Sequence, residues 1–278
     1  MKDIVKAPVI HDDAINEPAW KINSVAKCIR VLKCFTDVSP EWSLTQLAQK
    51  LSMPKSTLLN MLKTLEMFEL IVRSPVNNTY HLGIELLEMG YSVRSSLPIL
   101  QYAIPLLEEL QEKTGKIIYF TIPKNGKILY LESIYPGKRN IHYSVTGKTL
   151  PMHCTGCGKA IMSHLRQEEI DTIINHYGLS RFTPTTITDY HQLMEELRIT
   201  RERGYAIDLS EESFGVKCVA VPILASNRVL GSISVSGSKM NMPDEILPKY
   251  AELLSVVAIL MSAKADLFPE CSLLPRDY

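Results

Sequence analysis

Two helical patterns joined by a three-residue turn constrain this chain more than any other feature. The first pattern, residues 44–51, follows Ser43, a residue suited to cap a helix, and places its apolar residues on one face. The turn Ser52-Met53-Pro54 leads into a longer pattern at 55–68, whose leucines recur at helical spacing. Two helices joined by so short a turn predict a helix-turn-helix, in which the second helix projects from the domain.

The segments on either side complete a small domain. Residues from Ser24 onward form a preceding helix, with apolar residues at spacings of three and four. After the helix-turn-helix the period drops to two, and residues 70–73 and 79–82 are typical of strands on either side of the turn 74–78. Three helices followed by a hairpin predict a winged helix-turn-helix over residues 21–82.

The exposed side of the projecting helix carries groups that recognise nucleic acid. Lysine, serine and threonine near a helix start suit phosphate contacts, and the Asn60 amide is able to make two hydrogen bonds to adenine. Arg73, beside the expected wing, is placed to reach a phosphate or the minor groove. The residues predicted to bind DNA are Lys55, Ser56, Thr57, Asn60, Lys63 and Arg73.

The charge of this segment favours a polyanionic partner. The whole chain has 30 basic and 30 acidic residues, so its formal charge is zero. Residues 21–82 hold eight Lys or Arg and four Asp or Glu, which gives a net charge of +4. Basic charge gathered in one domain of a neutral chain indicates binding to double-stranded DNA. Helix-turn-helix geometry also occurs in protein–protein modules, so a sensor that no longer binds DNA is an alternative.

The remainder of the chain alternates strands and helices. Residues 83–97 are predicted to form a linker helix, and residues 98–278 a second domain. Two hairpins are expected, around Asn125-Gly126 and around Asn227, and a further strand at 140–145. Helices are expected over 99–114, 157–165, 167–177, 189–203 and 243–267. Helices beside antiparallel strands predict an α+β domain.

Composition limits the compartment and the chemistry. With 46% hydrophobic residues, the 278-residue chain is large enough for two folded domains. Residues 1–20 contain acids and prolines where a signal peptide would have an apolar core, so they are predicted to be a loose tail. The apolar run 253–263 is shorter than the roughly 20 residues that a membrane span needs. We therefore expect a cytoplasmic protein without a membrane partner, whose six cysteines are reduced thiols.

Several strings of this sequence resemble one known family. SLTQLAQKLSMPKSTLLNMLKTLEMFELI and NTYHLGIELLEMG resemble the DNA-binding half of IclR-type bacterial regulators. LPMHCTGCGKA, FTPTTIT, RERGYAIDLSEESFGVKCVAVPI and GSISVSG resemble the effector-binding half. The resemblance implies a GAF-like second domain that binds a small organic acid, assembly as a dimer or a dimer of dimers, and control of a catabolic operon, most simply as a repressor. We expect no enzymatic activity and no cofactor.

The string around Cys157 is interpreted as an effector site. Gly156, Cys157 and Gly158 are expected to expose backbone N–H groups at a helix start, which favours an anion such as a carboxylate. Because an ionised Asp208 accepts a hydrogen bond from a ligand hydroxyl, we expect a hydroxy- or keto-carboxylate as the effector. The residues to which the resemblance assigns effector contacts are Gly156, Cys157, Asp208, Cys218, Ser234 and Ser236.

Other interpretations of the same residues stay open at this point. Cys154 and Cys157, with His153 beside them, are also compatible with a zinc- or thiol-based sensor. The same thiols and histidine, oriented by Asp208, would suit a Cys-His enzyme. Cys218 is equally typical of an apolar core, and the two serines of a solvent-facing strand.

Overall fold

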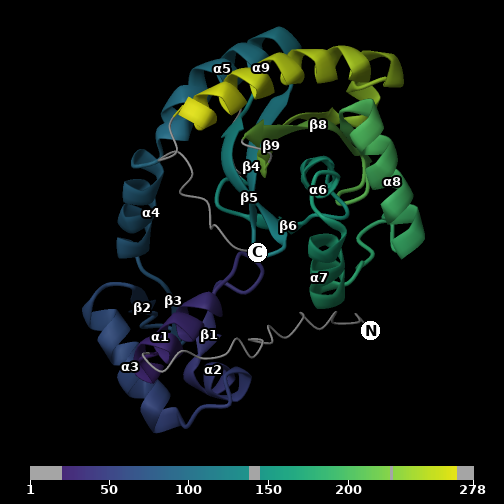
Figure 1. Cartoon of the computed structure of the whole chain (residues 1–278). Helices are drawn as coiled ribbons and strands as arrows, with labels where there is room; N and C mark the ends of the chain where they lie inside the picture. Colours follow the sequence, from purple (N-terminus) through teal and green to yellow (C-terminus); the bar gives the residue numbers. More distant parts are fainter. Residues whose placement is uncertain (1–20, 138–144, 226–227, 268–278) are drawn as a thin grey trace. The chain divides into compact units, whose positions relative to one another are not determined.

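The computed structural model describes three stretches of the chain, residues 21–137, 145–225 and 228–267 (Figure 1). The expected tail at 1–20, the turn at Asn227 and Cys271 lie outside the described residues, as does most of the strand expected at 140–145. The chain divides into two compact units between Val93 and Arg94, and each is described by itself.

The first unit is a three-helix domain with a small antiparallel sheet. Its elements are α1 (Asn23–Lys33), β1 (Trp42–Ser43), α2 (Leu44–Lys50), α3 (Lys55–Met67), β2 (Ile71–Arg73) and β3 (Thr79–Leu82). The strand order is β1–β3–β2, and both pairings are antiparallel. Leu47, Leu58 and Ile71 are fully buried where the helices meet the sheet. This arrangement is the winged helix-turn-helix that the sequence predicts.

The turn between α2 and α3 is fixed by local hydrogen bonds. Ser43 Oγ accepts from the backbone N–H of Gln46, whose side chain accepts from the backbone N–H of Ser43 at 2.9 Å, so α2 begins with a capping box. After α2, Ser52 takes a left-handed backbone conformation with φ of 50°. The N–H of Met53 then donates to the carbonyl of Ala48 at 3.0 Å. These contacts set the direction in which α3 leaves the turn.

Two features of this unit differ from the sequence prediction. The sequence does not predict β1, since two residues show no periodicity; its Trp42 indole N–H donates to the carbonyl of Cys34 at 2.9 Å. Val25 and Ile29 of α1, expected to face inward, are 53% and 46% exposed. The reason is that the core covers only the C-terminal half of α1, where Val31 is fully buried.

The second unit is a six-stranded antiparallel sheet with helices on both faces (Figure 1). In spatial order its strands are β6 (Thr149–Pro151), β5 (Lys127–Ile134), β4 (Ile117–Lys124), β9 (Arg228–Ser238), β8 (Val216–Ala225) and β7 (Ala206–Leu209). Its helices are α5 (Pro98–Thr114), α6 (Gly156–Met162), α7 (Gln167–Tyr177), α8 (Tyr190–Arg203) and α9 (Leu247–Leu267), and α4 (Glu85–Ser95) precedes them across the unit boundary. This is the α+β fold that the sequence predicts, with β6 and β7 as additional short strands.

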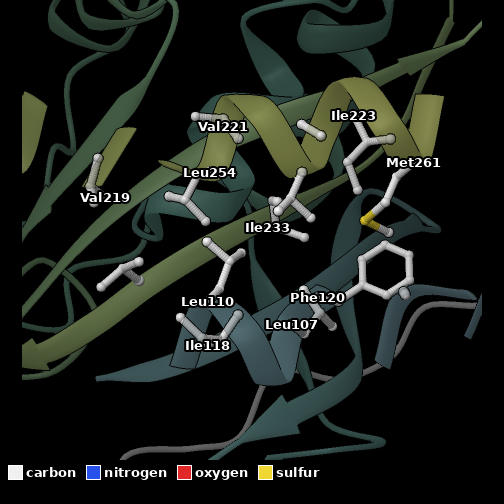
Figure 2. Packing of buried hydrophobic residues seen from close by; sticks show 14 of the residues in the cluster. Leu107, Leu110, Ile118, Phe120, Val219, Val221, Ile223, Ile233, Leu254 and Met261 are labelled. Carbon is white, nitrogen blue, oxygen red and sulfur yellow. The ribbon is translucent and has the colours of Figure 1, made fainter. Parts of the chain in front are cut away.

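One face of the sheet packs against α5 and α9. Leu107, Ile233, Leu254 and Met261 are fully buried in this layer (Figure 2), and each such side chain stabilises the fold by about 1.5–3 kcal/mol. The helical stretch Asp244–Ala265 is long and apolar enough by composition to cross a membrane. Leu254 and Met261 on one side of this helix are buried against the sheet, whereas Val256, Ile259 and Leu260 are exposed.

The opposite face of the sheet packs against α6, α7 and α8. Ile161, Met162 and Leu193 from these helices meet Ile128 and Ala220 of the sheet, and all five are fully buried. Every residue of α6 is buried. The polar residues predicted for the effector site lie on α6 and on the strands and loops that surround it.

The end of the wing is predicted to tolerate no side chain at Gly83. Its N–H donates to the carbonyl of Leu70 at 2.9 Å, and a Cβ at this position would lie 1.8 Å from the carbonyl oxygen of Glu69. We expect Gly83→Ala to lower the free energy of unfolding by about 1–3 kcal/mol, because backbone has to move. Urea unfolding followed by circular dichroism measures the change.

Gly90 provides the matched control. It lies within α4, and a Cβ there would meet nothing within 4 Å. Gly90→Ala is expected to stabilise the chain by about 0.5–1 kcal/mol, because alanine loses less backbone entropy in a helix. Similar effects of the two substitutions would contradict the close packing at Gly83.

Candidate functional site

The exposed face of α3 gathers most of the residues predicted to contact DNA. Ser56, Asn60 and Lys63 are spaced by four and three residues, so they share one side of the helix, and all three are exposed. Lys55 at the start of α3 is exposed, and Thr57 is half-buried. The opposite side of α3 is buried in the core. The helix therefore presents polar groups to solvent from Lys55 to Lys63, and the exposed Met67 follows at its end.

Contacts within the wing fix the position of the Arg73 side chain. The Arg73 guanidinium donates to Asn78 Oδ1 at 2.9 Å and lies 5.9 Å from the centre of the Tyr80 ring. Glu41 Oε2 accepts from the Thr79 hydroxyl at 2.9 Å, which ties the wing to the segment before β1. Sequence reasoning missed the roles of Glu41 and Asn78, although paired asparagines in the expected turn were a signal. The Arg73 charge thus sits on an ordered hairpin.

The start of α6 differs in one respect from the sequence prediction. The Thr155 hydroxyl accepts from the N–H of Gly158 at 3.1 Å, so this N–H is already capped and not free for a ligand. A Cβ at Gly158 would lie 2.2 Å from the carbonyl oxygen of Met152. Gly158 therefore permits close packing of the chain on itself, and the expectation that it offers an N–H to an effector is wrong.

The predicted effector residues come together beside α6. A Cβ added to Gly156 would lie 3.1 Å from Cys218 Sγ and 3.6 Å from Asp208 Cβ. On the sheet, Cys218 pairs with Ser236 across β8 and β9, and Ser234 lies two residues away on the same side. Both serines are buried, which excludes the alternative that they face solvent.

The Cys157 thiol lies among hydroxyl groups that sequence reasoning missed in part. Burial is the largest influence on the pKa of this thiol and raises it, whereas the nearby hydroxyls of Ser232, Ser234 and Thr121 lower it. Thr121 and Ser232 are fully buried and come from the neighbouring strands β4 and β9. Ser234 Oγ is buried and has no hydrogen-bond partner among the described residues. The alternation of small polar residues along β9 is the signal that would have included Ser232.

Two tyrosines complete this polar cluster. The rings of Tyr119 on β4 and Tyr130 on β5 meet edge to face, with 5.1 Å between their centres. Burial raises the pKa of both phenols far above the ordinary value, and the Cys157 and Cys218 thiols raise it further. These hydroxyls therefore stay protonated and act as neutral hydrogen-bonding groups.

The thiols of this region lack the properties of a reactive or metal-binding site. Burial raises the pKa of Cys154, Cys157 and Cys218, so the nucleophilic thiolate is disfavoured. His153 Nε2 lies 3.0 Å from the carbonyl of Ser180, and burial lowers the pKa of the imidazole. Within the described stretches, no three His, Cys, Asp or Glu side chains are grouped to hold a metal ion. Neither the zinc or thiol sensor nor the Cys-His enzyme gains support.

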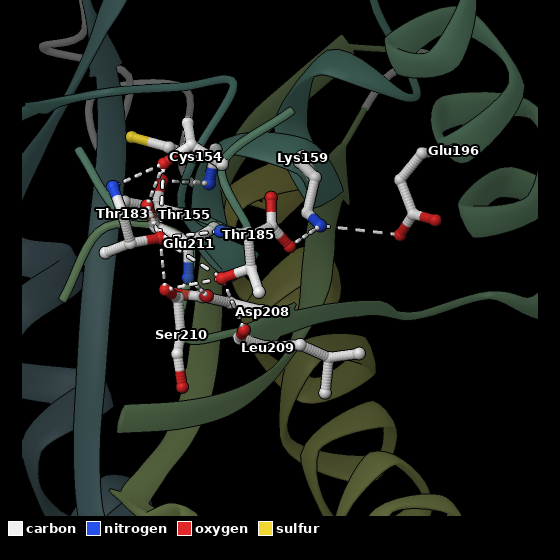
Figure 3. A network of polar contacts seen from close by, with 12 residues as sticks. Cys154, Thr155, Lys159, Thr183, Thr185, Glu196, Asp208, Leu209, Ser210 and Glu211 are labelled. Carbon is white, nitrogen blue, oxygen red and sulfur yellow. Dashed lines mark hydrogen bonds and ion pairs between the residues drawn. The ribbon is translucent and has the colours of Figure 1, made fainter. Parts of the chain in front are cut away.

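A buried ion pair lies under the site, and sequence reasoning missed it (Figure 3). Lys159 on α6 is 1% exposed; its Nζ lies 2.5 Å from Glu211 Oε1 and 3.5 Å from Glu196 Oε1. The Thr183 hydroxyl donates to the carbonyl of Ser210 at 2.7 Å. The hydroxyls of Thr185 and Thr186 donate to backbone carbonyls of the same loop. Together these contacts hold the loop after β7 against α6.

Asp208 is the acidic residue closest to the predicted effector contacts. It is 5% exposed, and its Oδ1 accepts from the backbone N–H of Glu211 at 2.8 Å. Burial is the largest influence on this carboxyl and raises its pKa to about 7, although the hydrogen bond from Glu211 lowers it. The carboxylates of Glu211 and Glu212 raise the pKa further, and Lys159 lowers it. Asp208 is thus partly protonated at neutral pH.

Comparisons of the sequence with known proteins cover both units. Residues 24–75 match a profile described as the IclR helix-turn-helix domain, and residues 91–263 match one described as bacterial transcriptional regulator IclR C-terminal. The HTH-type transcriptional regulator XynR of Escherichia coli is 34% identical over 242 residues, which cover 87% of this chain and 96% of XynR. The HTH-type transcriptional regulator BhcR of Paracoccus denitrificans is 32% identical over 230 residues, 82% of either chain. The HTH-type transcriptional repressor AllR of Escherichia coli is 28% identical over 214 residues, 76% of this chain and 79% of AllR.

Solved structures share the fold over most of the chain. An IclR family transcriptional regulator from Brucella abortus superimposes with a TM-score of 0.79 at 22% identity, covering 89% of this chain and 94% of that one. An IclR homologue from Microbacterium hydrocarbonoxydans, complexed with 4-hydroxybenzoate, gives a TM-score of 0.71 at 20% identity, covering 86% and 98%. At these identities the likeness establishes the fold.

Asp208 is expected to make the folded chain less stable as pH rises. Its folded pKa of about 7 lies above the ordinary value of 3.8, so the folded state holds the proton more tightly than the unfolded state. The resulting penalty is absent below about pH 4 and complete above about pH 7. Asp208→Asn removes the charge but keeps an acceptor for the Glu211 N–H, so its Tm relative to the parent should be higher at about pH 8 than at about pH 5.

Thermal unfolding followed by circular dichroism at the two pH values measures this difference. Glu202→Gln is the matched control, because it removes an exposed carboxylate on α8 that pairs with Arg198 and not with the cluster. An Asp208→Asn effect on Tm that is the same at both pH values would contradict the raised pKa.

Proposed function

The chain belongs to the IclR family of bacterial transcriptional regulators, and on that premise we propose that it represses a catabolic operon under the control of a small organic acid. The observation that carries the proposal is the division of its polar groups. One unit exposes a polar helix face on α3, within a segment of net charge +4. The other unit gathers its polar groups in the interior, around Cys157. Exposed polar groups on a helix are suited to contact operator DNA, and buried polar groups are suited to bind a small ligand.

The ligand class follows from the groups around Cys157. Ser234 Oγ is fully buried and makes no hydrogen bond among the described residues, where its neighbours are the thiols of Cys157 and Cys218. Thiols are weak hydrogen-bonding groups, so a ligand oxygen that pairs with this hydroxyl would recover free energy. The thiols and phenols beside it are neutral donors. A homologue of the same fold binds 4-hydroxybenzoate, a hydroxylated carboxylate. These points support a hydroxy- or keto-carboxylate as the effector.

The assembly and the role in the cell are further parts of the proposal. Ile22, which caps α1, and Val25 and Ile29 on the helix are exposed apolar residues at helical spacing. A second copy of the chain would cover them, so we infer a homodimer, or a dimer of dimers. The related AllR is named a repressor, and repression in the cytoplasm is the role that we assign to this chain.

DNA binding is expected to depend on α3 in two distinguishable ways. Lys55→Ala should weaken binding to every sequence and reduce the salt slope by about one, because a lysine–phosphate contact is lost. Asn60→Ala should instead reduce discrimination between operator and random DNA by about 1–3 kcal/mol, because a base contact is lost. Mobility shifts at several salt concentrations, on DNA upstream of the encoding gene, measure both effects.

Lys113→Ala is the control for these variants. It removes an exposed lysine from α5, in the other unit, where it pairs with Glu109. If Lys55→Ala and Asn60→Ala bind DNA no differently from Lys113→Ala, α3 is not the recognition helix.

Effector binding is expected to raise the Tm of the parent chain and to require Ser234. The probes are glycolate, glyoxylate, lactate, pyruvate and 4-hydroxybenzoate, each added to the full chain. Ser234→Ala should weaken binding of the most stabilising probe about tenfold, the effect of one hydrogen bond. Ser255→Ala, on α9 beyond the opposite face of the sheet, removes a hydroxyl that bonds only within its helix and should leave binding unchanged. Stabilisation by uncharged compounds alone would contradict the organic-acid proposal.

A further inference from the structure

We propose that Asp208 recognises the effector in its protonated form, as a hydrogen-bond donor, so that binding of an anionic effector takes up a proton. The inference rests on the proposed function, since it concerns the same site and the same class of ligand. It assigns to Asp208 a role opposite to the one that its residue type suggests, that of an ionised acceptor for a ligand hydroxyl. It also couples the regulator to intracellular pH.

The hydrogen bonds of Asp208 leave one of its oxygens for the ligand. Oδ1 accepts from the Glu211 N–H at 2.8 Å, which fixes the carboxyl group relative to the loop after β7. In the described part of the chain this is its one hydrogen bond, and no cation forms an ion pair with it. Oδ2 is therefore the atom that carries the proton and donates to the effector.

The nearby cation, Lys159, already forms ion pairs with two glutamates. Lys159 Nζ contacts Glu211 Oε1 at 2.5 Å and Glu196 Oε1 at 3.5 Å, and the lysine is 1% exposed. Two carboxylates thus share this one buried ammonium group. Its positive charge is offset before any effector arrives, and it offers little to a second anion beside Asp208.

Among the described residues, the other titratable groups that face Asp208 carry no positive charge. These are the thiols of Cys154, just before α6, of Cys157 on α6 and of Cys218 on β8, all of which burial keeps protonated. From its own loop, the carboxyls of Glu211 and Glu212 face it and add negative charge. Lys148 offsets part of the charge of Glu212. The surroundings of Asp208 are therefore neutral to negative.

An effector at this site has to lie near Asp208. A Cβ on Gly156 would stand 3.6 Å from Asp208 Cβ and 3.1 Å from Cys218 Sγ, so the aspartate packs close to the backbone of Gly156, beside the predicted contacts. The buried hydroxyl of Ser234 lies beside the thiols of Cys157 and Cys218. Two anions in a buried site do not both keep their charge; one takes a proton instead. The effector is the stronger acid, so the proton goes from solvent to Asp208.

The unliganded carboxyl is already close to this state. Burial holds its pKa at about 7, so protonating it at neutral pH costs little. An anion beside it raises the pKa further, and the complex then keeps the proton above neutral pH. Proton uptake per bound effector should approach one at about pH 8 and fall toward zero at about pH 6, where the free chain already holds the proton.

The test is titration calorimetry of the full chain with the acid that stabilises it most among glycolate, glyoxylate, lactate, pyruvate and 4-hydroxybenzoate. Titrations in phosphate and in Tris at about pH 8 give the number of protons taken up, because the two buffers differ in ionisation enthalpy. We expect nearly one proton. The dissociation constant should rise about tenfold per pH unit above about pH 7, since the ionised form has to be protonated first.

Asp208→Asn separates the two roles of this residue. Its amide oxygen still accepts the Glu211 N–H, and its NH₂ donates where the protonated acid would. We expect this variant to bind the probe with an affinity independent of pH, and at about pH 8 at least as tightly as the parent. Glu202→Gln, which removes an exposed carboxylate of α8, should keep the pH profile of the parent.

Each outcome decides between the alternatives. Binding without proton uptake, or a loss of affinity in Asp208→Asn of about tenfold or more at both about pH 6 and about pH 8, overturns the donor role of Asp208 and leaves the proposed function standing. Absence of binding by every acid at every pH overturns the proposed function, and the donor role with it. The proton count on the parent chain decides the matter even where the variant fails to fold.

Discussion

The alternation of side chains along β9 is the constraint on which the second unit depends. Ser232, Ser234 and Ser236 face α6, whereas Ile233 and Val235 face α5 and α9. One strand thus supplies both a wall of the apolar core and the floor of the polar cluster. Buried hydroxyls cost free energy unless they are paired, and the apolar side of the same strand offsets that cost. The layer behind the polar cluster is mainly apolar, and its burial offsets the cost of the buried hydroxyls.

The sequence predicts the features that are set by neighbours along the chain. The helix-turn-helix follows from periodicity and from a three-residue turn, and the serines of β9 follow from a period of two. Lys159 and Glu211 are 52 residues apart, and no local pattern joins them. The same holds for Thr183, whose hydroxyl meets the carbonyl of Ser210 at a separation of 27 residues. Such contacts depend on the packing of α6 against the loop after β7, which only the tertiary structure reveals.

Two glycines show the limit of reading a motif from its letters. Gly156 and Gly158 stand in one string and suggest one purpose, the exposure of N–H groups. Yet Gly158 lies against the carbonyl of Met152, and its N–H bonds to Thr155, whereas Gly156 lies against Cys218 and Asp208. Gly158 lets the chain pack on itself, and Gly156 lets α6 pack on the strands that carry the candidate site. Short strands have a related limit: β6 and β7 have three and four residues, too few to show a period.

The polar groups around Cys157 carry little net charge, and this affects how the site selects its ligand. A free buried cation would attract any small anion, because charge attraction depends little on shape. Here the ammonium group of Lys159 is held by two carboxylates, and the groups around Cys157 are thiols, hydroxyls and a carboxyl with a pKa of about 7. A ligand that leaves fixed donors and acceptors unpaired binds much more weakly, because each unpaired buried group costs free energy. A single charge discriminates less between ligands of different shape. Selection among organic acids of equal charge then depends on where their hydroxyl or carbonyl oxygens lie. Because the pKa of Asp208 is about 7, its carboxyl group can take up a proton and so does not repel an anionic ligand.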